Sequence, residues 1–182
     1  AGHKLGAPVG IGALFLRDPQ AVQPLQRGGG QERGWRSGTQ AAALIEALRL
    51  AVTESISDVA ARGQRMATQR DTLQGQLAAA LPNVCVIGDQ NARLPNTLCL
   101  AFAGISAESL VMLLDSQGVA VATGSACSSG SGKPSAVLVA MGAPRQGVLR
   151  DSLGPDHSDR ELAAAGRKII RAVRRLRALA AG

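Results

Sequence analysis

Apolar and polar positions along the chain predict a mixed α/β protein with a long helical segment near its middle. From residue 40 to about residue 77, apolar side chains recur at the spacing of one helical face. The stripe consists of Leu44, Leu48, Val52, Ile56, Val59, Met66, Leu73 and Leu77. The pattern predicts either one long helix or two consecutive helices, packed against the rest of the protein.

Shorter apolar runs predict strands on both sides of this helical segment. Most of them are bounded by turn-forming Gly, Pro, Asn or Asp residues, as strands in small sheets usually are. The predicted strands are residues 11–16, 84–87, 97–102, 119–121 and 146–154. The last four of these predict a small α/β layer in the second part of the chain.

Three further helices are predicted in that layer. One follows Ser106, a favoured N-cap residue, and one covers residues 135–141 after a proline. The last begins at Ser158, which forms a capping-box pattern with Glu161. We expect it to bury Leu162, Ile169, Val173 and Leu176 and to expose Arg167, Lys168, Arg171, Arg174, Arg175 and Arg177.

The composition narrows the possible partners. A length of 182 residues allows one domain with a core, or one domain and part of another. The net charge of +7 suits nucleic acid, but two Phe, one Trp and no Tyr leave few rings for stacking on bases. We therefore expect no nucleic-acid partner, and a basic surface that is solvated or meets an acidic protein. We also expect no membrane partner, because there is neither a signal peptide nor a membrane-length apolar run.

The three cysteines differ in their surroundings. Their irregular spacing indicates no metal site and their odd number no disulfide scaffold, so we expect a cytoplasmic protein. Cys85 and Cys99 lie within predicted strands and are expected in the core. Cys127 lies in a run of small residues at 122–132, where nothing large can bury its sulfur. It is either a mobile thiol suited to sulfur transfer or a small buried filler.

The residues around Cys127 carry a resemblance. Gly-Ser-Ala-Cys-Ser-Ser-Gly at residues 124–130 is similar to the active-site loop of the NifS/IscS-like (group I) cysteine desulfurases. These enzymes belong to the class V aminotransferase family and use pyridoxal 5'-phosphate (PLP). The resemblance implies that Cys127 attacks the substrate sulfur and becomes a persulfide. This requires a thiolate, and an ordinary thiol has a pKa of about 8.5.

A second resemblance lies at the start of the chain. Residues 3–14, which read His-Lys-Leu-Gly-Ala-Pro-Val-Gly-Ile-Gly-Ala-Leu, are similar to the segment that carries the PLP lysine in this family. The resemblance implies that Lys4 binds PLP covalently and that His3 lies beside the cofactor. Two positions differ from the usual family pattern, since Ala1 replaces a serine and Val9 replaces a frequent lysine.

The glycine-rich stretch at residues 27–39 is a third candidate. On its own it fits either a phosphate-binding loop or a plain surface loop. It resembles the family motif Gly-Gly-Gly-x-Glu-x-Gly-x-Arg-Ser-Gly-Thr. That resemblance implies that Thr39 reaches the PLP phosphate of another subunit, and hence a homodimer. Arg36 is expected to order the loop.

Arg150 is the candidate substrate ligand. Arg-Asp-Ser-Leu-Gly at residues 150–154 resembles the family's Arg-x-Ser-Leu-Gly segment, in which the arginine holds the substrate carboxylate. Asp151 is an unusually polar neighbour that we expect to neutralise Arg150 in part. His157 is expected to be a solvated turn residue.

Taken together, the resemblances imply the C-terminal portion of a PLP fold-type I enzyme. Residues 1–58 would be the remnant of the large PLP-binding domain with the start of the linker helix. Residues 59–182 would be the small α/β domain with the cysteine loop. Since the resemblance covers only the C-terminal half of a family member, we expect a fragment of a longer enzyme.

The implied reaction converts L-cysteine to L-alanine and passes sulfur through Cys127 to a sulfur acceptor or an iron–sulfur scaffold protein. No metal is implied. One alternative is a selenocysteine lyase or another class V enzyme. The other is a non-enzymatic module that docks a partner through the basic last helix.

Overall fold

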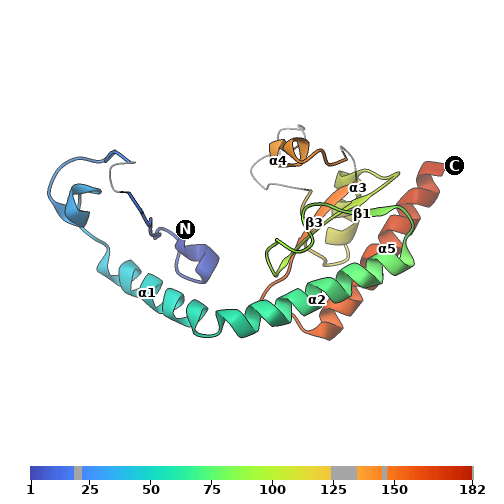
Figure 1. Ribbon diagram of the computed structural model, residues 1–182, viewed down its shortest axis with the longest axis horizontal. Coiled ribbons are helices and arrows are strands. Elements are labelled where there is room, and N and C mark those ends of the chain that lie inside the picture. Colours follow the sequence, from blue (N-terminus) through green and yellow to red (C-terminus); the bar gives the residue numbers. More distant parts are fainter. Residues whose placement is uncertain (19–21, 124–134, 145–146, 182) are drawn as a thin grey trace. The chain divides into compact units, whose positions relative to one another are not determined.

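The computed structural model describes residues 1–18, 22–123, 135–144 and 147–181 (Figure 1). The chain divides into two compact units, Ala1–Val59 and Ala60–Gly182. Within the described residues, no helix has both the length and the apolar character needed to cross a membrane.

The described residues of the first unit include two short 3-10 helices and one α-helix. These are η1 (Gly2–Leu5), η3 (Gln31–Gly34) and α1 (Ala42–Ser57). The strand predicted at residues 11–16 is absent, and Phe15 is 89% exposed. The prediction was wrong because an apolar run becomes a strand only when a neighbouring strand pairs with its backbone along its length. Among the described residues no strand pairs with residues 11–16.

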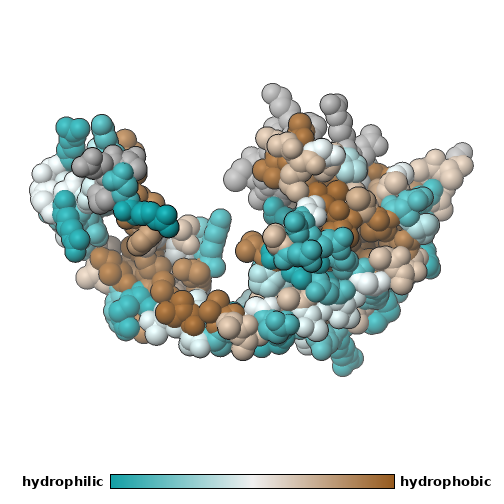
Figure 2. All heavy atoms as spheres, viewed as in Figure 1, coloured by the Kyte–Doolittle hydropathy of each residue, from teal (hydrophilic) through white to brown (hydrophobic). Residues whose placement is uncertain are grey.

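The segment predicted as one long helix or two consecutive helices forms two helices. α1 ends at Ser57, because the next residue, Asp58, has a non-helical φ of −133°, and α2 covers Val59–Ala80. α2 packs as expected, with Met66, Leu73 and Leu77 buried. α1 does not, because Ala51 is its sole buried residue. Figure 2 shows brown apolar side chains along the surface of α1.

The second unit is built on an antiparallel sheet in the order β1-β2-β3, formed by Val84–Val86, Thr97–Phe102 and Val148–Ser152. These strands confirm three of the predicted ones. The fourth, at 119–121, is absent. Nearby, Ala122 pairs with β3 through two backbone hydrogen bonds with Arg150 of 3.1 and 2.7 Å.

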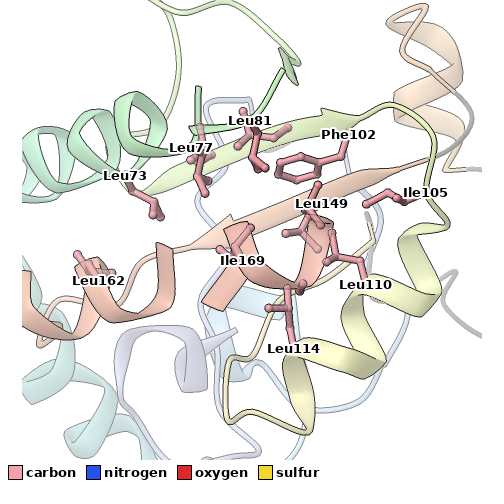
Figure 3. Packing of buried hydrophobic residues seen from close by; sticks show 14 of the residues in the cluster. Leu73, Leu77, Leu81, Phe102, Ile105, Leu110, Leu114, Leu149, Leu162 and Ile169 are labelled. Carbon is pink, nitrogen blue, oxygen red and sulfur yellow. The ribbon is translucent and has the colours of Figure 1, made fainter. Parts of the chain in front are cut away.

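One face of this sheet carries the hydrophobic core. Leu98, Leu100 and Phe102 alternate along β2 and are fully buried. They pack against leucines and isoleucines of α2, α3 (Ala107–Asp115) and α5 (Asp159–Ala181) (Figure 3). Burying each such side chain contributes roughly 1.5–3 kcal/mol. The residues between them on β2, including Cys99, point to the opposite face.

The predicted helix starts are confirmed. The hydroxyl of Ser106 accepts a hydrogen bond from the backbone N–H of Ser109 at the start of α3. At α5, the hydroxyl of Ser158 accepts from the backbone of Glu161, and a carboxylate oxygen of Glu161 accepts from the backbone of Ser158. The helix predicted at 135–141 forms as the short α4 (Ala136–Ala140).

The basic face of α5 differs from the prediction at two positions. Lys168 and Arg177 are half-buried. The ammonium of Lys168 donates to the carbonyl of Gln117 at 2.7 Å, and the guanidinium of Arg177 donates to the carbonyls of Pro82 and Ala103. Long cationic side chains can bury their stems while their charged ends satisfy loop carbonyls.

Candidate active site

Lys4 lies on a compact turn at the start of the first unit. The backbone N–H of Gly2 donates to Ile11 O at 2.8 Å, and that of Ala7 donates to Gly2 O at 3.1 Å. Gly6 ends η1 in the left-handed region at φ 88°, which glycine adopts without strain. His3 and Lys4 are exposed on this turn. The side chain of Lys4 is therefore exposed on a turn whose backbone is held by hydrogen bonds.

The glycine-rich loop is closed by its own hydrogen bonds. The buried hydroxyl of Ser37 donates to Gly29 O at 2.7 Å, and the backbone N–H of Gly38 donates to Gln31 Oε1 at 3.3 Å. Arg36 donates from Nη1 to Ser37 O, so it contributes to the order of the loop. Thr39 follows directly and is exposed. Its hydroxyl is available to a ligand.

Arg150 belongs to the second unit and is fixed from both sides. On one side its backbone faces Cys99 of β2, and on the other it is bridged to Ala122. Ala122 stands five residues before Cys127 in the sequence. Cys127 itself lies outside the described residues. The backbone of the half-buried Arg150 is thus held beside residue 122, which leads into the segment that carries Cys127.

The other two cysteines occupy different environments. Cys85 was predicted in the core but is exposed. β1 is an edge strand whose Val84 and Val86 pack against the core, so the residue between them points outward. Cys99 is half-buried, and burial raises the pKa of its thiol although the charge of Arg150 opposes the shift. Cys99 is therefore held mainly as a neutral thiol.

Asp151 does not neutralise Arg150, contrary to the prediction. Successive residues of a strand point to opposite faces, and Asp151 stands opposite the core residue Leu98. Its side chain is buried, and burial raises the pKa of its carboxyl to about 7. This acid on the core side of β3 is the main feature that motif-based reasoning missed. The alternation Leu149, Asp151, Leu153 was the signal that could have revealed it.

The predicted site residues fall into both units. His3, Lys4 and Thr39 belong to Ala1–Val59, and Arg150 belongs to Ala60–Gly182. His157 is exposed in a turn, as predicted, and its Nδ1 accepts from the backbone of Gly154 at 2.9 Å. In the described part of the chain, no three His, Cys, Asp or Glu side chains are grouped so that they could hold a metal ion.

Comparison with known proteins identifies the class. Residues 1–164 match the family model "Aminotransferase class-V", so the chain belongs to the class V aminotransferase family. It is 40% identical to the cysteine desulfurase NifS of Azotobacter vinelandii over 97% of this chain and 44% of that protein. It is also 40% identical to an IscS-like cysteine desulfurase of Mycobacterium tuberculosis, over 97% of this chain and 46% of the relative.

Solved structures support the same fold. A NifS-like protein matches with a TM-score of 0.81 at 30% identity, over 97% of this chain and 46% of that chain. The cysteine desulfurase CsdA of Escherichia coli matches with a TM-score of 0.73 at 24% identity, over 97% of this chain and 45% of that chain. At this identity the match supports the fold alone. The chain spans less than half the length of these relatives. The predicted fold, that of PLP fold-type I enzymes, is confirmed, and the partial coverage is consistent with the predicted C-terminal portion.

Enzymes of this family depend on PLP, and the residues present fit that cofactor. The turn around Lys4 is closely packed, since a Cβ on Gly2 would lie 2.9 Å from Ile11 O. It presents one primary amine and one imidazole. The glycine-rich loop adds the exposed hydroxyl of Thr39. An amine can bond to the PLP aldehyde and a hydroxyl can donate to its phosphate, so these residues fit part of a PLP site.

Proposed function

We propose that this chain carries the lysine, the nucleophile and the carboxylate ligand of a PLP-dependent cysteine desulfurase. The observation that supports this most is the bridge between Arg150 and Ala122. It ties the group suited to hold a substrate carboxylate to the segment that leads to Cys127. The family membership and the motifs around Lys4 and Cys127 point to the same reaction.

Each residue has a distinct task in this proposal. The amine of Lys4 holds PLP, His3 lies beside it, and Thr39 donates to the phosphate of a cofactor in a second subunit. When bound, PLP supplies an electron sink for the substrate carbon atoms. Arg150 binds the carboxylate of L-cysteine through two parallel N–H donors and so fixes the orientation of the substrate sulfur.

The sulfur transfer takes place at Cys127. Its thiolate forms a bond to the substrate sulfur while the carbon–sulfur bond of the substrate breaks. The electron pair stays on the substrate carbon, which takes up a proton, and L-alanine leaves. Cys127 then carries a persulfide. A thiolate of an acceptor or iron–sulfur scaffold protein attacks the outer sulfur, and Cys127 leaves as a thiolate.

Replacement of Arg150 tests the substrate assignment. Arg150→Gln should raise KM for L-cysteine roughly 10- to 100-fold, because a charge-assisted hydrogen-bond pair is lost. Arg150→Lys should recover part of this loss. Alanine formation by the PLP-loaded protein is the measurement, and Arg171→Gln on the exposed face of α5 is the control. An unchanged KM in Arg150→Gln would remove Arg150 from the site. Faster turnover of selenocysteine than of cysteine would assign another class V activity.

A further inference from the structure

The second unit contains a cavity of about 450 Å³ between α5, residues 118–121 and the end of β3. It exists because residues 118–121 do not continue the pairing with β3 that begins at Ala122. Its walls are mainly apolar and include Leu73, Val119, Val121, Leu153, Leu162 and Ile169. Small-molecule sites typically measure roughly 300–1,000 Å³, so the cavity is large enough for a ligand.

One acidic side chain in this cavity has a buried oxygen without a hydrogen-bond partner. Asp151 lines the cavity, is 5% exposed, and its Oδ2 makes no hydrogen bond. Leaving a buried polar atom unpaired costs about 1–3 kcal/mol, and more for a charged one. A ligand that donates to this carboxylate would recover that cost.

The other titratable groups at the cavity already have partners. The ammonium of Lys168 donates to Gln117 O, the carboxylate of Glu161 accepts from Ser158, and the ring of His157 accepts from Gly154. α2 and residues 118–121 contribute no titratable side chain to the lining. Next to Asp151, Cys99 and Arg150 lie on the other face of the sheet. Asp151 differs from the exposed Glu161 in being the buried carboxyl of the lining, with an oxygen that has no hydrogen-bond partner.

We propose that this cavity binds an aliphatic primary ammonium group, which donates to the Asp151 carboxylate while its alkyl part packs on the apolar walls. The ammonium can belong to a free amine or to a lysine side chain of a peptide. The site is separate from the proposed active site, because Asp151 and Arg150 point to opposite faces of β3. It does not depend on PLP or on the desulfurase reaction.

Titration of the 182-residue chain with n-butylammonium at pH 8, followed by ¹⁵N NMR and calorimetry, tests this proposal. We expect saturable shifts at the residues around the cavity, and binding at least roughly 10-fold weaker for n-butanol, which has the same length without charge. Nα-acetyl-lysine methylamide tests the peptide source in the same way. Binding of only one of the two ammonium probes identifies the source.

Two variants and the pH dependence make the test decisive. Asp151→Asn should weaken binding roughly 10-fold or more, while Glu108→Gln, on exposed α3 surface, should leave it unchanged. Wild-type binding should weaken between pH 8 and pH 5.5, because the carboxylate becomes protonated. Equal binding by Asp151→Asn, or no binding of either ammonium probe, would overturn the proposal. Binding that appears only in Lys168→Gln would also overturn it, since Lys168 would then be the partner of Asp151.

Discussion

The free energy of unfolding of the second unit is expected to fall by about 2.5 kcal/mol as the pH rises from 5 to 8. The cause is Asp151, whose carboxyl pKa is raised by burial from 3.8 to about 7 in the folded protein. Between these values the folded state holds a proton that the unfolded state has lost. The stabilisation is complete below pH 3.8, is lost as the pH rises through 7, and does not change further above that.

Urea unfolding at pH 5 and pH 8, followed by far-UV circular dichroism, measures this effect. The one tryptophan, Trp35, lies in the first unit. Its fluorescence follows unfolding of that unit and so serves as an internal control, because Asp151 belongs to the second unit. The surface acids with lowered pKa values, such as Asp89 and Glu161, lose their contribution only at lower pH and do not affect this window.

Asp151→Leu supplies the matched variant. It removes the buried carboxyl and fills part of the cavity, so it should stabilise the second unit by about 2–4 kcal/mol at pH 8. Its stability should also be nearly constant between pH 5 and pH 8. If the variant kept the pH dependence of the wild type, another group would be responsible and the burial of Asp151 would not explain it.

Cys127→Ser is expected to reduce alanine formation from L-cysteine by roughly 10³-fold or more, because a hydroxyl cannot accept the substrate sulfur as a persulfide. Cys85→Ser and Cys99→Ser are the matched controls and should keep most of the activity. Mass spectrometry of the PLP-loaded protein after brief treatment with L-cysteine should locate one additional sulfur on Cys127.

Cys85 is the main competitor in this experiment, because it is the exposed thiol among the described residues. If Cys127→Ser kept full activity while Cys85→Ser lost it, the assignment of the nucleophile would be wrong. Loss of activity in Cys99→Ser with unchanged stability would instead indicate a contribution from the thiol opposite Arg150.

Local sequence signals predicted much of the second unit. β1, β2 and β3 follow short apolar runs, and α3 and α5 begin at the expected serine caps. Residues 11–16 and 119–121 were predicted wrongly because pairing of a strand depends on a neighbour that is distant in the sequence. Lys168 and Arg177 were misplaced for a related reason, since their acceptors are carbonyls of distant loops.

The candidate site was predictable only where short motifs carry it. The motifs named Lys4, Thr39 and Arg150, and the structure places all three on backbones held by hydrogen bonds or sheet pairing. The cavity at Asp151 could not be predicted in this way. It depends on how residues 118–121 separate from β3 opposite α5, and no local pattern encodes that spacing.

The most direct test is whether Lys4 binds PLP covalently. It is made by recording the absorption spectrum of this chain mixed with PLP, followed by borohydride reduction and peptide mapping. The chain has three lysines, Lys4, Lys133 and Lys168, so a covalent adduct can be assigned without ambiguity and distinguished from one at the N-terminal amine. We expect a visible band that changes on addition of L-cysteine, an adduct on Lys4, and loss of both in Lys4→Ala but not in Lys133→Ala or Lys168→Ala. An unaltered band in Lys4→Ala, or no band in a folded wild-type chain, would contradict this expectation.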